Sequence, residues 1–253
     1  MNISGHSAIV TGGGSGLGRA TARALAARGA RVGVIDRNAD AAMRVAAEIG
    51  GLGLVGDVAD EAAMASALSA AREAHGPCRV LVNCAGIGAA RRVVGREGPM
   101  PLADFERVIR VNLVGAFNMI RLAGAEMSVA EPLECGGRGV IVTTASAAAF
   151  EGQIGQSAYS ASKGGIASLT LPVAREFAAF GIRVMCIAPG LFETPLLEQL
   201  PEETRRALAA AVPYPKRLGA PEEFAALALH IVENDFLNGE TIRIDGALRL
   251  PPK

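Results

Sequence analysis

The chain has 253 residues, of which 50% are apolar and 20% are charged, and its 25 Lys and Arg balance its 25 Asp and Glu. High hydrophobicity without net charge excludes a disordered chain, and the absence of a cationic surplus argues against a nucleic-acid-binding protein. No uncharged apolar run approaches the roughly 18 residues of a membrane span, and no signal-type segment stands at the N-terminus, so we expect a cytoplasmic protein without a membrane partner.

Short apolar runs rich in β-branched residues alternate along the chain with alanine-rich segments. The apolar runs predict strands at residues 7–11, 31–36, 52–56, 79–83, 139–143, 182–187 and 241–245. The alanine-rich segments predict helices at residues 16–28, 39–49, 60–75, 102–128, 156–179, 203–211 and 221–233. Nearly continuous apolar strands are typical of strands covered on both faces. We therefore expect an α/β fold: a single Rossmann-type, doubly wound domain over residues 1–253, with a seven-stranded parallel sheet and helices on both faces.

Two segments interrupt this alternation. Residues 88–101 are rich in Gly, Arg and Pro and predict a surface loop. Residues 188–220 contain several prolines and one predicted short helix, and they follow the C-terminal end of a strand. Long excursions at this end of a parallel sheet commonly form lids, so we expect residues 188–220 to cover a substrate pocket.

A glycine-rich turn joins the first predicted strand to the first predicted helix. Its glycines Gly12, Gly16 and Gly18 have the spacing GxxxGxG. Glycine lets a backbone turn tightly and approach a pyrophosphate, whose charge is then stabilised at the helix N-terminus. A strand before and a helix after this turn favour a dinucleotide site over a purely structural turn.

Asp36 ends the second predicted strand, where a carboxylate can accept hydrogen bonds from the ribose hydroxyls of adenosine. It would repel a 2′-phosphate, and Gly13 and Gly14 offer no basic side chain in compensation, so we expect NAD as the cofactor. Arg37 follows directly and could turn toward a phosphate, which leaves NADP open. We also expect contacts to the coenzyme from residues after the third and fourth strands, Asp57, Val58, Asn83, Cys84, Ala85 and Gly86.

The chain has two tyrosines, Tyr159 and Tyr214, and three lysines among its 25 cationic residues. Tyr159 and Lys163 are four residues apart in a predicted helix and therefore share a face. An ammonium group stabilises a phenolate beside it, which lets a tyrosine act as a general acid or base near neutral pH. Ser146 follows the fifth predicted strand, where its hydroxyl can reach a substrate oxygen. Four cysteines without a CxxC pair and three scattered histidines predict no metal site.

Together these residues make the chain resemble the short-chain dehydrogenase/reductase family over its whole length. The matching positions are Thr11, Gly12, Gly16, Gly18, Asn83, Ala85, Gly86, Asn112, Ser146, Tyr159, Lys163, Pro189 and Gly190. The resemblance implies hydride transfer to or from a nicotinamide ring, with Tyr159 as acid/base and Lys163 tuning it while holding the ribose. It further implies that Ser146 orients the substrate oxygen, that Asn112 holds a water of a proton relay, and that the coenzyme also contacts Ser15, Leu17, Pro189 and Gly190. Cys84 departs from the family, where many members have asparagine.

Segments 149–156, 187–192 and 236–247 are similar to a narrower group, the type II 3-hydroxyacyl-CoA dehydrogenases. This resemblance implies NAD-dependent oxidation of short 3-hydroxyacyl-CoA thioesters in fatty acid metabolism, and a homotetramer. It implies that Gln153 and Gln156 lie near the substrate and that Phe192 and Thr194 lie by the nicotinamide. The 88–101 loop contains three arginines, Arg91, Arg92 and Arg96. They either contact the phosphates of coenzyme A or are simply solvated, and the sequence leaves both alternatives open.

Other functions remain open on the same scaffold. A 3-ketoacyl reductase, a hydroxysteroid dehydrogenase or another alcohol dehydrogenase would share the catalytic residues and differ in the lid. A dinucleotide-sensing protein without catalysis would keep the fold alone. The intact set of Ser146, Tyr159 and Lys163 favours an enzyme over such a sensor.

Overall fold

Seven parallel strands form one sheet in the order β3–β2–β1–β4–β7–β8–β9. The coordinates are a computed structural model that describes residues 1–198 and 200–252. The strand bounds are β1 Ser7–Thr11, β2 Arg31–Asp36, β3 Leu52–Val55, β4 Cys78–Asn83, β7 Gly139–Thr144, β8 Ile182–Pro189 and β9 Thr241–Ile244. The direction of winding reverses between β1 and β4, and ligands of such sheets bind at the carboxyl ends of the strands beside this reversal.

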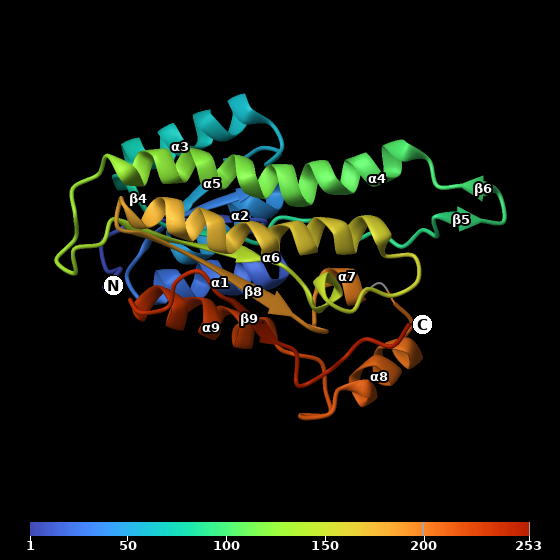
Figure 1. Cartoon of the computed structure of the whole chain (residues 1–253). Helices are drawn as coiled ribbons and strands as arrows, with labels where there is room; N and C mark the ends of the chain where they lie inside the picture. The colour runs from blue at the N-terminus through green and yellow to red at the C-terminus, as the bar shows by residue number, and fades with distance from the viewer. Residues whose placement is uncertain (199, 253) are drawn as a thin grey trace.

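Helices cover both faces of the sheet (Figure 1). The two buried clusters divide them into a layer of α1, α2 and α9 and a layer of α3, α5 and α6. The helix bounds are α1 Gly16–Ala27, α2 Ala39–Ile49, α3 Glu61–His75, α4 Leu102–Ile109, α5 Gly115–Ser128, α6 Ser157–Ala178, α7 Pro195–Glu198, α8 Glu202–Ala211 and α9 Pro221–Glu233. The arrangement is the doubly wound α/β fold expected from the sequence.

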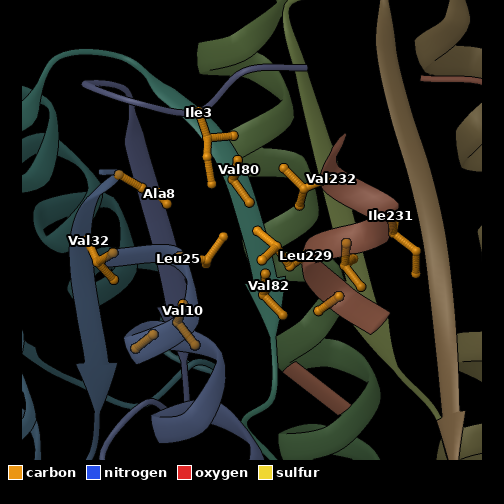
Figure 2. Packing of buried hydrophobic residues seen from close by; sticks show 14 of the residues in the cluster. Ile3, Ala8, Val10, Leu25, Val32, Val80, Val82, Leu229, Ile231 and Val232 are labelled. Carbon is orange, nitrogen blue, oxygen red and sulfur yellow. The ribbon is translucent and has the colours of Figure 1, made fainter. Parts of the chain in front are cut away.

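The strands are apolar throughout because their side chains alternate between two buried layers. In β4, Val80 and Val82 belong to the cluster under α1 and α9, whereas Leu81 belongs to the cluster under α3 and α5. Figure 2 shows the first of these layers, in which Val80 and Val82 of β4 lie near Leu25 of α1 and Leu229 of α9. A strand of this kind has no solvent-facing side, which explains why an alternating pattern is missing from the sequence.

Local capping residues set the starts of several helices. The Asn38 side chain accepts a hydrogen bond from the Ala41 N–H at the start of α2, and Asp60 does the same for Ala63 at the start of α3. Gly50 ends α2 in the left-handed conformation, with φ of 64°. Polar N-caps and a glycine after the last turn satisfy backbone groups that a helix leaves unpaired at its ends.

The structure differs from the sequence prediction in the two irregular segments. Residues 88–101 are not a plain loop, because β5 Val94–Gly95 and β6 Gly98–Pro99 form a short antiparallel hairpin. Figure 1 shows this hairpin projecting beyond the end of α4. Where the structure describes it, the segment predicted to hold one short helix contains two, α7 and α8. β8 extends two residues further than expected, to Pro189. A two-residue strand and a four-residue helix are too short to produce a recognisable period.

The predicted helix at residues 102–128 is a single helical run, but it is not α-helical throughout. A π-helical segment, Arg110–Val114, separates α4 from α5. This run of 27 residues is the one helix, among the described residues, that is long and apolar enough to cross a membrane by length and composition. Half of the residues in its apolar window are buried inside the protein, where the run packs on α6, α3 and β4. A core helix passes the same test, so this is weak evidence for a membrane span.

Candidate functional site

The glycine-rich turn lies directly against the loop that follows β4. Gly12 has a φ of +62°, and a methyl group there would be 2.8 Å from the main-chain N and Cα of Ala85. A methyl group on Gly18 would be 2.2 Å from the carbonyl oxygen of Gly12. A side chain at Gly12 would push the turn away from the loop after β4, and one at Gly18 would push the turn away from the start of α1. The turn therefore exposes backbone, rather than side chains, at the helix N-terminus.

Asp36 lies at the end of β2 beside this turn. Its Oδ2 accepts a hydrogen bond of 3.0 Å from the Gly14 N–H, and its Oδ1 accepts one of 3.0 Å from the Asn38 N–H. Arg37 is exposed. The carboxylate is thereby held in a defined orientation next to the backbone that would meet the coenzyme.

The end of β4 is joined to the end of β1 through Thr11. The Thr11 hydroxyl donates to Asn83 Oδ1 at 3.3 Å and accepts from the Ala85 N–H at 3.2 Å, while the Cys84 N–H donates to the Thr11 carbonyl at 3.1 Å. The sequence motif included Thr11, but its role in holding Asn83, Cys84 and Ala85 was not expected. Only the pairing of β1 with β4 reveals it.

Asp57 and Val58 follow β3 on the same edge of the sheet. The Asp57 carboxylate accepts from the Ala59 N–H at 2.9 Å, and the Val58 carbonyl accepts from Asn118 Nδ2 at 2.8 Å. Asp57 is exposed and Val58 is buried. Both expected residues thus stand at the carboxyl edge of the sheet, and Asn118 is an additional support that the sequence did not indicate.

The thiol of Cys84 is enclosed although the residue as a whole is partly exposed. Burial raises the pKa of Cys84 to about 11, against smaller opposing effects of the Thr144 hydroxyl and the Lys163 ammonium. A thiol reacts as its thiolate, so Cys84 stays unreactive at all pH values well below 11. We expect iodoacetamide at pH 8 to label the exposed Cys135 and to spare Cys84, as measured by peptide mass spectrometry. Equal labelling of both cysteines at pH 8 would contradict the buried thiol.

Tyr159 and Lys163 face each other on α6, as their spacing predicted. The Lys163 ammonium nitrogen is 5.8 Å from the centroid of the Tyr159 ring and donates a 2.7 Å hydrogen bond to the Thr144 carbonyl at the end of β7. Lys163 is only 5% exposed. Within residues 1–198 and 200–252, no described carboxylate forms an ion pair with it. A buried ammonium without a carboxylate partner is costly unless it serves a ligand or a neighbouring group.

Ser146 caps the short 3₁₀ helix Ala147–Ala149 that follows β7. Its Oγ accepts a 3.1 Å hydrogen bond from the Ala148 N–H. This contact occupies a lone pair of the hydroxyl and leaves its proton available to an external acceptor. The hydroxyl is therefore oriented as a hydrogen-bond donor at the carboxyl edge of the sheet.

Asn112 lies in the π-helical segment and is fully buried. Its Nδ2 donates to the Ser162 hydroxyl and to the Ile87 carbonyl, each at 3.0 Å, and its Oδ1 accepts from the Ile87 N–H at 2.8 Å. The side chain thus ties the loop after β4 to α6. A methyl group on Gly86 would lie 3.2 Å from Asn112 Oδ1 and 3.5 Å from the Lys163 ammonium, so these three residues meet in space.

The segment after β8 approaches the glycine-rich turn. A methyl group on Gly16 would be 3.4 Å from Pro195 Cδ and 3.6 Å from Thr194 Cγ2. The Phe192 side chain, however, is 5% exposed and packs edge-on against the Phe224 ring in the core. Phe192 can therefore meet a coenzyme through its main chain but not through its ring. Its aromatic side chain belongs to the buried layer because the segment is pinned by a β-bridge to Gly219.

Gln153 and Gln156 lie in the segment that joins Ser146 to Tyr159, and both amides already have partners there. Gln156 Oε1 accepts from the Gln153 N–H at 3.0 Å, and Gln153 Nε2 donates to the Pro251 carbonyl at 3.1 Å. The contact with the C-terminal segment was not expected from the sequence. Pro189 ends β8 and Gly190 follows it, and the Gly190 N–H donates to the Ile244 carbonyl at 2.9 Å.

A cavity of about 320 Å³ lies beside the start of α1. Gly14, Ser15 and Gly16 line it together with arginines of α1 and α2 and residues of the 188–220 segment, Arg19, Arg23, Arg44, Glu193 and Pro195. Ser146, Tyr159 and Lys163 do not line it. It therefore belongs to the coenzyme end of the site rather than to the reacting atoms. The part of the chain that the structure describes contains no group of three His, Cys, Asp or Glu side chains able to hold a metal.

Comparisons with known proteins agree with this geometry. The family model described as short chain dehydrogenase matches residues 6–205. The chain is 51% identical over 255 residues to 3-hydroxyacyl-CoA dehydrogenase type-2 of Bos taurus, covering 99% of this chain and 98% of that one. It is 35% identical to levodione reductase of Leifsonia aquatica, covering 94% and 92%. A crystal structure of 3-hydroxyacyl-CoA dehydrogenase type-2 from Mycobacterium avium superposes with a TM-score of 0.94 at 43% identity, covering 98% of each chain.

Proposed function

Because this chain belongs to the short-chain dehydrogenase family and is an oxidoreductase, we propose that it interconverts 3-hydroxyacyl-CoA and 3-ketoacyl-CoA with NAD as the coenzyme. The observation that carries the chemistry is the buried Lys163 ammonium, without an acidic partner among the described residues, over the Tyr159 ring. The substrate class rests on relatives that share about half their residues with this chain over nearly its full length.

The residues present fit a nicotinamide coenzyme. Gly12 and Gly18 let the turn pack directly on neighbouring backbone where any side chain would collide, and the turn leads into the N-terminus of α1, whose first turn has no acidic residue. Unpaired N–H groups at a helix start favour a pyrophosphate. Lys163 has hydrogen-bond donors beyond the one given to Thr144, and these can hold the hydroxyls of a ribose. When bound, the nicotinamide ring supplies or accepts the hydride.

The chain's own residues manage the proton. In the direction of ketone reduction, the Tyr159 hydroxyl donates its proton to the substrate oxygen while the Ser146 hydroxyl donates a hydrogen bond to the same oxygen. Lys163 stabilises the negative charge left on the Tyr159 oxygen, because an ammonium beside a phenolate favours the charged form. Asn112 keeps α6 in register with the loop after β4, which holds Tyr159 and Lys163 in place.

We propose NAD over NADP because the Asp36 carboxylate is oriented beside the turn and would repel a 2′-phosphate. Replacing Asp36 by Asn removes the charge but keeps an oxygen for the Gly14 N–H. We expect kcat/KM with NADH to fall roughly tenfold or more, since hydrogen bonds to a charged group contribute about 1.5–3 kcal/mol. The kcat/KM with NADPH rises in the same variant, and steady-state kinetics with both coenzymes measure the ratio.

A matched control is Asp40→Asn, which removes the same charge from the exposed first turn of α2. It should leave the ratio of the two coenzymes near that of the wild type. An unchanged ratio in Asp36→Asn would show that Asp36 does not select the coenzyme.

Steady-state rates with acetoacetyl-CoA, free acetoacetate and a ketosteroid, each with NADH, test the substrate class. We expect kcat/KM to be highest for the thioester. Equal or higher values for the steroid or the free acid would favour the alternatives, a hydroxysteroid dehydrogenase or another alcohol dehydrogenase. The relative named levodione reductase is an example of such an alternative, because its name describes a different reaction in a protein of the same family.

The β5–β6 hairpin supports a thioester substrate through its arginines. Arg91 pairs with Asp104 at 2.5 Å, and the Arg91 N–H binds the Gly155 carbonyl at 2.8 Å, which anchors the hairpin base to the segment before α6. Arg92 and Arg96 are exposed and, among the described side chains, form no ion pair. Exposed cations on an arm beside the site can attract the phosphates of coenzyme A.

Changing Arg92 and Arg96 together to Glu should therefore raise KM for acetoacetyl-CoA about tenfold, while KM for a small uncharged ketone stays the same. Steady-state kinetics at low ionic strength provide the measurement. The control is Arg31→Glu with Arg72→Glu, an identical charge change on exposed residues at the other end of the strands. An equal change of KM for both substrates, or an equal change in the control variant, would show that Arg92 and Arg96 are solvated surface groups that do not bind coenzyme A.

We also propose that the protein assembles as a homotetramer in the cytoplasm, as a single catalytic domain in which residues 188–220 cover the substrate. The exposed apolar residues Val114, Phe117 and Leu171 support an assembly, since they lie on η1 (the π-helical segment Arg110–Val114), α5 and α6. Figure 1 shows α5 and α6 side by side with no further layer over them. Light scattering coupled to size exclusion measures the assembly, and a monomer would overturn this part of the proposal.

A further inference from the structure

Arg243, one residue before the end of β9, joins two segments that lie far apart in the sequence. Its Nη1 and Nη2 each form a 2.7 Å contact to Glu151, one to each carboxylate oxygen, and its Nε binds Asp245 Oδ2 at 2.7 Å. The Arg243 side chain is 21% exposed and that of Asp245 only 7%. Bidentate, partly buried pairs of this kind hold geometry more firmly than single exposed ion pairs.

Arg249 adds a second cation to the same two carboxylates. It lies 3.1 Å from Asp245 and 3.5 Å from Glu151. A methyl group on Gly190 would be 2.7 Å from Asp245 Cβ, so this cluster also borders the turn after β8. Residues 243–249 are therefore joined to the segment around Glu151 by ion pairs, and they pack against the Gly190 turn.

The residues after Arg249 continue the contact, because two of their main-chain carbonyls accept hydrogen bonds from the loop. The Pro251 carbonyl accepts from Gln153 Nε2 at 3.1 Å, and the Pro252 carbonyl accepts from the Ile154 N–H at 3.0 Å. Residues 243–252, which we call the C-terminal clamp, thus hold the substrate-side loop at three positions, Glu151, Gln153 and Ile154.

The clamped loop is the connection between Ser146 and Tyr159. It comprises residues 147–156, from the 3₁₀ helix after Ser146 to the residue before α6. A shift of this loop changes the separation of the two hydroxyls that must meet one substrate oxygen. Small misplacements of reacting groups reduce rates strongly, because alignment is a large part of catalysis.

We infer that the C-terminal clamp is a positioning element of the active site: Arg243 and the residues that follow it set the placement of the loop between Ser146 and Tyr159. This inference rests on the proposed function in one respect: the substrate with which the activity is measured. Arg243 and Glu151 are positioning residues, since their pair joins β9 to the loop and neither residue touches the reacting atoms.

A shortened chain that ends at Arg249 is the first test, because it removes the contacts to Gln153 and Ile154 and leaves the buried layers intact. We expect kcat/KM for acetoacetyl-CoA reduction to fall roughly 10- to 100-fold while the Kd for NADH stays the same. Hydrogen exchange should become faster in residues 147–156 and stay unchanged in residues 12–18. Unchanged activity with unchanged exchange would overturn the inference.

The second test is a cycle of Arg243→Gln, Glu151→Gln and the double variant. If the two residues act through one pair, the double variant loses about as much kcat/KM as either single variant. Arg243→Lys keeps the charge and one hydrogen bond, so it should recover part of kcat. Arg28→Gln, which breaks an ion pair with Glu233 between α1 and α9, serves as the control and should keep wild-type activity.

The outcomes separate the two proposals. Full additivity in the cycle, or a parallel loss of NADH binding and activity, would mean general loosening and would overturn the clamp. A wild-type protein without thioester activity, but with faster exchange in residues 147–156 of the shortened chain, would reject the substrate and keep the clamp. If Arg243→Gln does not fold, the shortened chain decides alone.

Discussion

Replacing Tyr159 by Phe should lower kcat by about three orders of magnitude while the Kd for NADH changes less than about twofold. The substitution removes one oxygen and keeps the ring that lies 5.8 Å from the Lys163 ammonium. General acid–base catalysis by a positioned side chain contributes roughly 10²–10⁴-fold to a rate, and no other tyrosine lies on α6 to replace it. Steady-state rates and NADH fluorescence titration measure the two quantities.

Tyr214→Phe is the matched control for this experiment. Tyr214 is the other tyrosine of the chain, its side chain is mostly in solvent at 83% exposure, and we expect its replacement to leave kcat unchanged. Turnover that persists in Tyr159→Phe would mean that another group supplies the proton. A loss of NADH binding equal to the loss of kcat would instead mark Tyr159 as a coenzyme contact.

The second large effect is expected at the glycine-rich turn. Gly18→Ala places a methyl group 2.2 Å from the Gly12 carbonyl oxygen, and both partners are backbone that cannot rotate away. Overpacking of this kind costs about 1–3 kcal/mol or more, and the turn can relieve it only by leaving α1. If the coenzyme loses about 3 kcal/mol of binding, its affinity falls by roughly two orders of magnitude. Isothermal titration with NADH and thermal unfolding report both effects.

Gly164→Ala on α6 is the control, because it is also a helical glycine. A methyl group there would be 3.8 Å from the Ala149 carbonyl oxygen, which is an ordinary contact. Alanine favours a helix over glycine by about 1 kcal/mol, so this variant should be at least as stable as the wild type and bind NADH normally. Normal NADH binding in Gly18→Ala would refute a coenzyme site at this turn.

Local sequence determined most of the fold and the contact between the two residues proposed to handle the proton. The apolar runs placed all seven strands of the large sheet within two residues of their observed ends, because strands buried on both faces have no polar positions. The spacing of Tyr159 and Lys163 predicted their contact, because residues four apart on a helix share a face. Gly12, Gly16 and Gly18 predicted the tight turn for an equally local reason.

Only the tertiary structure decided which distant residues meet. Asn112 joins Ile87 to Ser162 from inside a π-helical segment that no sequence period marks. Phe192 turns its ring into the core, although the resemblance implied a place by the nicotinamide. Arg243 and Glu151 are 92 residues apart, and β9 must be in place before they can pair. Secondary structure and turns follow from neighbours along the chain, whereas such pairs depend on how elements pack, which local patterns do not encode.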